Sequence, residues 1–284
     1  MGAMMPEELT ASPRVKDTVA VGGQLQSAVS RASASKVPEV TVLFWVVKIL
    51  TTGMGETTSD FLVHQFEPEI ALALGFAALL ISLLLQFSVR RYIPWVYWTA
   101  VAMVSVFGTM AADAVHVGLG VPYLASTLFF TVALAVVFLL WHRSEKTLSI
   151  HSITTRRRES FYWAAVLTTF ALGTATGDLT AYTLGLGYFA SGIMFAAVIA
   201  VPALAHWRRL LAAIPAFWFA YILTRPLGAS FSDWTAVSSD RGGLDWGTGP
   251  VSLALAAGIA VLVALMTIKR RNHEPERQDH LIQA

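Results

Sequence analysis

Long apolar segments follow one another along most of the chain, with short polar stretches between them. In windows of about 19 residues, eight segments are apolar enough to cross a bilayer: 37–65, 69–89, 93–118, 122–142, 160–185, 188–207, 211–236 and 249–268. Segments this long do not show the residue-by-residue alternation of membrane β-strands. The pattern predicts an all-α polytopic membrane protein with eight transmembrane helices.

Four of these segments repeat one motif without gaps. They read WVVKILTTGMGETTSD from Trp45, WTAVAMVSVFGTMAAD from Trp98, WAAVLTTFALGTATGD from Trp163 and WFAYILTRPLGASFSD from Trp218. Each has Trp, then Gly ten residues on (55, 108, 173 and 228), then Asp fifteen residues on (60, 113, 178 and 233). Internal repeats of this kind decide the architecture. They predict four parallel two-helix repeats, at about 36–91, 92–145, 159–209 and 210–271 of one membrane domain (36–271).

Each repeat is expected to be a helical hairpin of one polar and one apolar helix. The polar, odd-numbered helices would lie inside a pseudo-fourfold bundle, and their apolar partners would face lipid. At 3.6 residues per turn, the polar residues of one repeat share a helical face. The predicted ion path on these faces comprises Lys48, Thr52, Glu56, Asp60, Asp113, Asp178, Arg225 and Asp233.

Ionisable side chains at membrane depth are costly, so they normally mark a functional site. Oxygen and imidazole ligands suit a borderline divalent metal ion, which makes Glu56, Asp60, His64, Asp113 and His116 the candidate ligands. The simpler alternative is that the four aspartates hold helices together. Arg225 is expected to neutralise the acids. Lys48 is expected to be the inner counter-charge of Glu56 and Asp60, or to exchange a proton.

Basic residues mark one side of the membrane. They precede the first segment and recur at 90–91, 143–158, 208–209 and 269–271, whereas the opposite connections hold only Arg241. The positive-inside rule therefore predicts that both termini are cytoplasmic. Residues 1–35, expected to be disordered, and 272–284 would form cytoplasmic tails. The net charge of +2 reflects this topology, and nucleic-acid binding is not expected.

The composition, 55% hydrophobic and 13% charged residues, does not fit a soluble domain. The chain has no cysteine, so thiol chemistry, iron–sulfur clusters and cysteine-based zinc sites are excluded. Walker, Rossmann and HExxH motifs are absent too, and no catalytic Ser/His/Asp spacing occurs. We therefore expect no enzymatic activity and no resident cofactor.

The first repeat, KVPEVTVLFWVVKILTTGMGETTSD, and the LGLGY of the third resemble a bacterial membrane-protein family defined by a tandem two-helix repeat of unknown function. Members are often labelled "membrane-anchored protein". The resemblance covers residues 36–271, and its K-x-x-TT-x-x-GET-x-x-D signature matches from Lys48 to Asp60. It implies an eight-helix fold in a bacterial inner membrane and supplies no activity.

The residues themselves favour a transporter of a cation, with a divalent metal such as Mn, Fe or Zn as the best match. Without an ATPase domain, a proton or ion gradient would supply the energy. The partners would then be the lipid bilayer and a small cation or other small solute. Two alternatives stay open: an intramembrane enzyme that uses Glu56 and Asp60 as acid and base, and a non-transporting partner or sensor protein. The oligomeric state and the direction of transport are not predicted.

Overall fold

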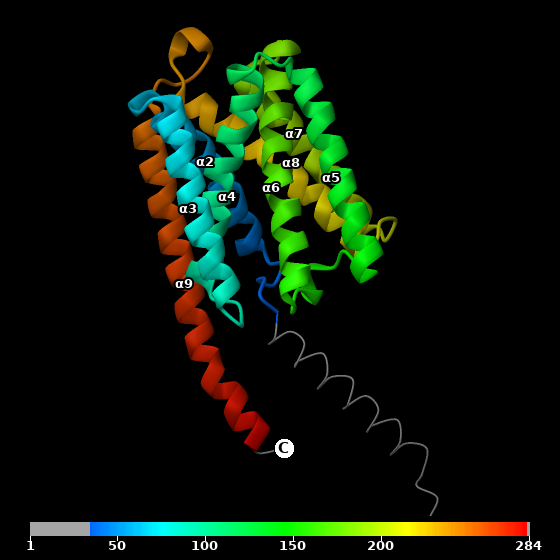
Figure 1. The fold of residues 1–284 in the computed structure, drawn as a ribbon. Helices are drawn as coiled ribbons and strands as arrows, with labels where there is room; N and C mark the ends of the chain where they lie inside the picture. Colours follow the sequence, from blue (N-terminus) through cyan, green and yellow to red (C-terminus); the bar gives the residue numbers. More distant parts are fainter. Residues whose placement is uncertain (1–34, 283–284) are drawn as a thin grey trace, which may run out of the picture.

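The computed structural model describes residues 35–282, with side chains as far as residue 270. This part forms eight α-helices and no strand: α2 (Val42–Gln65), α3 (Pro68–Ser88), α4 (Pro94–Asp113), α5 (Tyr123–Glu145), α6 (Arg156–Asp178), α7 (Gly187–Trp207), α8 (Ala213–Ala236) and α9 (Thr248–Ile282) (Figure 1). They coincide closely with the eight predicted segments. Of the predicted N-terminal tail, residues 1–34 lie outside the described part, and α9 continues as a helix through most of the predicted C-terminal tail.

Five helices of the described part are long and apolar enough to cross a membrane, judged by length and composition. They are α3, α4 with the turn that follows it, α5, α7 and α9. The other three, α2, α6 and α8, contain too many threonines, glycines and charged residues to reach the same hydropathy. Polar residues of this kind need neighbours that shield them from lipid.

Several helix ends follow from local sequence. The hydroxyls of Thr41 and Thr155 accept hydrogen bonds from the backbone N–H three residues on and so cap α2 and α6. Pro68 and Pro94 begin α3 and α4, where the missing N–H costs nothing. Gly185, in the turn between α6 and α7, has φ +67°, which favours glycine. These features keep the turns short and hold consecutive helices antiparallel.

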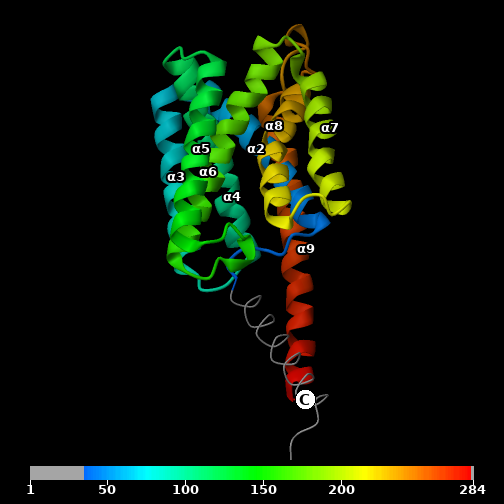
Figure 2. The same cartoon turned by 90° about the vertical axis from the view of Figure 1, so that its right-hand side faces the viewer.

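The helices fall into a central and a peripheral set. The central helices, α2, α4, α6 and α8, bury about half of their residues or more, whereas the peripheral helices, α3, α5, α7 and α9, bury few. Among the central helices, α2 packs against α4 and α8, and α6 also packs against α4 and α8. Figures 1 and 2 show the peripheral helices on the flanks, with α7 beside α8. The polar helices therefore shield one another's polar faces.

The peripheral helices do not pack as the hairpin expectation implied. Each lies mainly against the central helix of the following repeat: α3 on α4, α5 on α6, and α7 on α8. The last peripheral helix, α9, covers α2, the first central helix. The contact between α2 and its own partner α3 is small by comparison. The peripheral helix of each repeat thus covers the central helix of the next repeat. A single hairpin would bury too little surface to be stable alone.

The repeat glycines lie where neighbouring central helices touch. A side chain at Gly55 would collide with Ser105, one at Gly108 with Phe170, one at Gly173 with Arg225, and one at Gly228 with Thr52. Each of these partners stands seven residues after the Trp of its own repeat. The four glycines therefore make equivalent contacts, and the close approach of the central helices depends on them.

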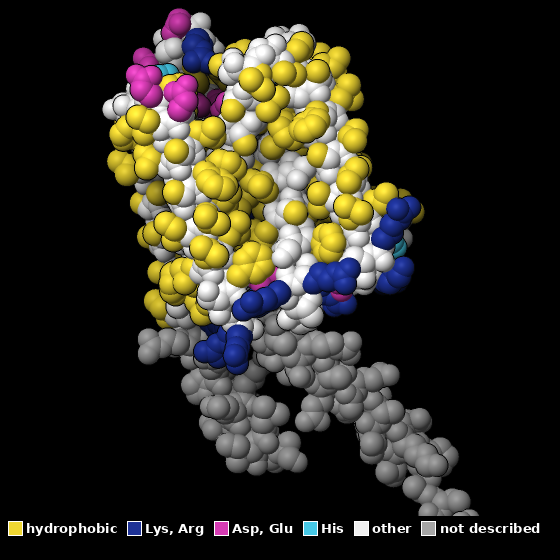
Figure 3. Space-filling view, viewed as in Figure 1, with side chains coloured by type: hydrophobic (Ala, Val, Ile, Leu, Met, Phe, Trp, Pro, Cys, Tyr) yellow, Lys and Arg dark blue, Asp and Glu magenta, His cyan; other side chains and the backbone are white. Residues whose placement is uncertain are grey.

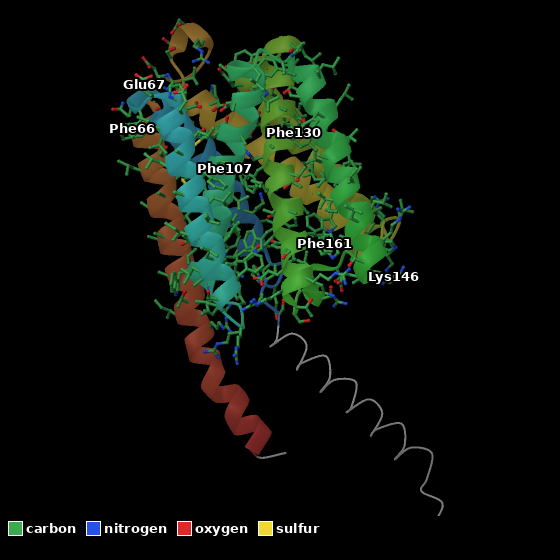
Figure 4. All side chains as sticks on the ribbon, in the orientation of Figure 1. Phe66, Glu67, Phe107, Phe130, Lys146 and Phe161 are labelled. Atoms are coloured by element: carbon green, nitrogen blue, oxygen red, sulfur yellow. The ribbon has the colours of Figure 1, made fainter. Side chains whose placement is uncertain are left out.

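The two ends of the helical bundle carry opposite charges. Figure 3 shows most of the visible Asp and Glu side chains at one end, with a single basic group among them, and Lys and Arg side chains at the other, with a hydrophobic band between the two ends. Figure 4 places Phe66 and Glu67 at the first end, far from Lys146 near the second. We call these the acidic end and the basic end. The repeat aspartates lie toward the acidic end of the central helices.

Candidate functional site

An ion pair between Arg225 and Glu56 occupies the middle of the bundle. The Arg225 side chain is 0% exposed, that of Glu56 is 7% exposed, and guanidinium Nη2 contacts carboxylate Oε2. Nη2 also donates to the hydroxyls of Thr109 and of Thr174, the latter at 2.7 Å, and Nη1 donates to the Thr52 carbonyl at 3.4 Å. Each central helix therefore contributes to the shell of one arginine. Charge pairing combined with this hydrogen bonding is what keeps a buried ion pair tolerable.

Lys48 lies on the basic-end side of this pair and is not the ion-pair partner of Glu56. Its side chain is buried at 1% exposure, and Nζ has no hydrogen-bond acceptor within the described part of the chain. Two aromatic rings enclose it: Nζ lies 4.1 Å from the ring centre of Phe170 and 4.4 Å from that of Tyr221. Lys48 therefore relies on cation–π contact. The counter-charge of Glu56 is Arg225, which was expected from the sequence to neutralise the acids, and not Lys48.

A second polar group lies at the acidic end, between α4 and α6. His116 Nε2 lies 3.1 Å from Asp113 Oδ1 and 3.3 Å from Asp178 Oδ2. His116 Nδ1 lies 3.3 Å from the Ser126 hydroxyl, which fixes the imidazole plane. One ligand atom from each of Asp113, His116 and Asp178 lies within 4.8 Å of the other two. Two carboxylates and one imidazole form a donor set suited to a borderline divalent metal ion.

Both aspartates of this group stand at the start of a π-helical turn. The turn η1 (Ala114–Gly118) follows Asp113, and η3 (Leu179–Thr183) follows Asp178. Such turns are rare and are frequently found at functional sites. They widen the helix, so residues beyond each aspartate lie on a different face from the one that α-helical spacing gives. His116 belongs to η1 and reaches Asp178 on the neighbouring helix from there.

Tyrosines and one arginine cover this group on the acidic-end side. The ring of Tyr123 lies 4.8 Å from that of His116 and stacks on Tyr182 at 5.8 Å. Arg241, from the connection between α8 and α9, donates to the hydroxyls of Tyr182 at 2.7 Å and Tyr188 at 2.9 Å. The Asp113 side chain is still 30% exposed, so the group remains accessible from this end.

The remaining candidates do not all join this group. Asp60 and Asp233 lie close enough to Asp178 and Glu56 to interact electrostatically, and Asp233 is buried with Oδ1 unpaired among the described residues. His64 is exposed, and its Nδ1 contacts the Asp60 carbonyl of its own helix at 2.6 Å. The five predicted ligands therefore do not form one site. Asp113 and His116 come together with Asp178, which was predicted for the path but not as a ligand, whereas Glu56 belongs to the central ion pair.

A buried polar network lies at the basic end, around the start of α6. Lys36 Nζ lies 2.6 Å from Glu159 Oε2, and Gln86 donates to the other Glu159 oxygen at 2.9 Å. All three side chains are buried. Sequence reasoning missed this network. Its only signal is Glu159, an acid within an otherwise basic stretch, and nothing local identifies its partners.

These observations define a membrane-type, all-helical repeat protein with a polar interior. The family model described as "Repeat of Unknown Function (DUF347)" matches residues 43–92, 96–147, 161–210 and 216–272. The chain belongs to that family, as the tandem-repeat resemblance of the sequence indicated. No curated protein and no solved structure matched the chain.

Proposed function

We propose that this protein is an inner-membrane transporter of a cation, with a divalent metal ion as the favoured substrate. The observation that carries the proposal is the convergence of Asp113, His116 and Asp178, whose ligand atoms lie within 4.8 Å of one another at the accessible acidic end. A site of two carboxylates and one imidazole discriminates in favour of ions such as Mn²⁺, Fe²⁺ or Zn²⁺ over bare alkali ions. The proposal assigns no catalytic residue and no resident cofactor.

The proposed topology has eight membrane crossings in a pseudo-fourfold bundle, with both termini in the cytoplasm. The cyclic packing of the central helices and the equivalent contacts of the four repeat glycines support this arrangement. So does the segregation of basic residues to one end, because positively charged connections are retained in the cytoplasm. In this arrangement α2, α6 and α8 cross the membrane surrounded by other helices, so their low hydropathy does not exclude them.

The proposed path does not run open from end to end. A cation that leaves the Asp113–His116–Asp178 group toward the basic end meets the Arg225–Glu56 pair, whose carboxylate is already paired, and then the positively charged Lys48. The buried Lys36–Glu159 pair lies beyond them. A continuously open channel would not contain such a barrier. The barrier favours a transporter that changes conformation and couples cation movement to a proton or ion gradient.

Uptake in proteoliposomes tests the proposal metal by metal, with Mn²⁺, Fe²⁺ and Zn²⁺ and an imposed pH gradient. Asp178→Asn and His116→Gln should abolish accumulation of the transported ion, because each removes a ligand. Asp60→Asn should reduce transport but leave metal binding intact, since Asp60 lies on the path outside the ligand group. Asp240→Asn, in the exposed connection at the same end, is the matched control and should transport normally. Absence of uptake for every metal, or normal uptake by Asp178→Asn, contradicts the proposal.

A further inference from the structure

A cavity of about 620 Å³ lies in the flank of the bundle, in its basic-end half. Its walls come from α2, α7 and α8 and from residues 148–151 between α5 and α6. Small side chains create the space, because α7 and α8 present alanines to it: Ala200, Ala203, Ala213, Ala216 and Ala220. Its volume falls within the range of about 300–1,000 Å³ that is usual for small-molecule sites.

The rim of the cavity nearest the basic end is polar. His151 and His206 line it together with Ser149, and none of the lining residues is acidic. Arg208 and Arg209 stand two and three residues after His206, just beyond the end of α7, and both are exposed. Glu39 precedes the lining residue Val40 on the opposite wall and is also exposed. Positive charge is therefore concentrated on the α7 side of the rim.

The mouth of the cavity lies within an apolar flank of the protein. Neighbouring residues on α7, on α8 and in the connection between them are large, hydrophobic and exposed: Val201, Leu204, Leu210, Ile214 and Phe219. In the proposed topology this flank meets lipid, and the rim lies at the level of the head groups of the cytoplasmic leaflet. An occupant of this cavity would meet apolar walls along its length and positive charge at one end.

We propose that this cavity is a binding site for an anionic phospholipid, with an acyl chain between α2, α7 and α8 and the phosphate beside His206 and Arg208. Basic residues at head-group level attract anionic lipid, and each contributes measurably to affinity. The floor of the cavity includes Ile49 and Thr224, which adjoin Lys48 and Arg225 in the chain. The lipid would therefore lie against α2 and α8 beside the place where these two helices touch. The inference does not depend on what the protein transports.

A second cavity of nearly equal size provides a matched comparison. It measures about 630 Å³ and lies between α2, α4 and α9, with Thr99 and Thr267 as its only polar lining residues. It offers a similar volume without lining histidines, although Lys269 and Arg270 directly follow its lining residue Ile268. A lipid selected by the histidine-lined rim should prefer the first cavity, whereas a lipid that merely fills space should occupy both.

Native mass spectrometry of the full-length protein tests this inference, using phosphatidylglycerol and phosphatidylcholine with identical acyl chains. We expect one phosphatidylglycerol retained per chain in preference to phosphatidylcholine. Ala203→Phe should remove this retained lipid, and Ala220→Leu provides a second filling variant, with thermal unfolding used to verify folding. Ala260→Phe, which fills the second cavity, should leave it in place. Arg208→Gln should lower the preference for the anionic lipid about fivefold, whereas Arg156→Gln, another exposed basic residue, should not.

Three results would overturn the inference. Equal retention of the two lipids would mean that the cavity is filled without regard to charge. Undiminished retention of phosphatidylglycerol by both folded filling variants would place the lipid elsewhere. Loss of a dimer in Ala203→Phe, with lipid unchanged, would make this flank a contact between copies of the chain.

Discussion

The Arg225–Glu56 pair and the Asp113–His116–Asp178 group use the same repeated framework in opposite ways. In the pair, one cation and one anion are buried. Guanidinium Nη2 donates hydrogen bonds to threonine hydroxyls on α4 and α6, while Nε has no acceptor among the described residues. In the group at the acidic end, two carboxylates share one imidazole and Asp113 remains 30% exposed. The first is neutral and closed, and the second keeps excess negative charge that a cation could balance.

The difference shows how the repeats have diverged. Glu56, Thr109, Thr174 and Ala229 all stand eleven residues after the Trp of their repeats, and the first three contact or surround Arg225. At this level the repeats have specialised to hold one ion pair. Four residues further on, every repeat keeps Asp, but only the second and third have a π-helical turn after it. Those two repeats form the candidate ligand group.

Breaking the central ion pair should have the largest effect. Glu56→Gln removes the negative charge and leaves the buried Arg225 guanidinium uncompensated, which costs about 3–5 kcal/mol of folding free energy. The double change Glu56→Gln with Arg225→Met should recover much of that loss, because no buried charge remains. Thermal unfolding of the purified protein in detergent measures both. A single Glu56→Gln variant as stable as the unchanged protein would show that the pair contributes no stability.

Removing one ligand at the acidic end should affect metal affinity more than stability. His116→Gln and Asp178→Asn should each weaken binding of the preferred metal at least about tenfold. Each removes an atom that would bind the metal, and even the loss of a hydrogen-bond partner of such a ligand costs about 10–100-fold. Titration calorimetry with the purified protein measures this. Because metal ligands bind in their deprotonated form, binding should also weaken as the pH falls. His64→Gln should bind metal normally, because His64 lies outside the group.

The helix contacts that support both regions can be tested at two glycines of α6. At Gly173 an added methyl group would collide with the Arg225 side chain, so Gly173→Ala should cost about 1–3 kcal/mol. At Gly177 the nearest atom would lie 3.9 Å away, so Gly177→Ala should be neutral or stabilise by up to about 1 kcal/mol. Unfolding midpoints of the two variants should therefore move in opposite directions. Equal losses would argue that α6 is simply intolerant of alanine.

Lys48 should show the smallest effect, despite being a buried charge. Because its Nζ has no hydrogen-bond acceptor within the described residues, Lys48→Met removes no ion pair and fills a similar volume. We expect the free energy of unfolding to stay within about 1 kcal/mol of that of the unchanged protein, since apolar replacement of a buried charge is often neutral or stabilising. A loss comparable with that of Glu56→Gln would reveal a partner for Lys48 in the folded protein.

The repeat register explains what could be foreseen from the sequence. The spacing of Trp, Gly and Asp indicated which helices are polar and where the glycines permit close approach, because both depend only on position along one helix. It also placed His116 within reach of Asp113. It indicated both Arg225 and Lys48 as counter-charges but could not decide which of them meets Glu56, because that depends on how α2 and α8 cross. Nor could it join Asp178 to His116, since the π-helical turns alter the helical face after each aspartate.

The packing of α9 on α2 has a consequence for how the protein is made. The helix that carries Lys48, Glu56 and Asp60 is synthesised first among the eight, yet its cover is synthesised last. Until α9 is inserted, one face of this polar helix has no intramolecular neighbour and must be tolerated by the insertion machinery or the lipid. A chain truncated after α8 would keep every residue of the candidate ligand group and still leave its first helix open to one side. The packing around the first helix can therefore be completed only after the last of the eight helices has been made.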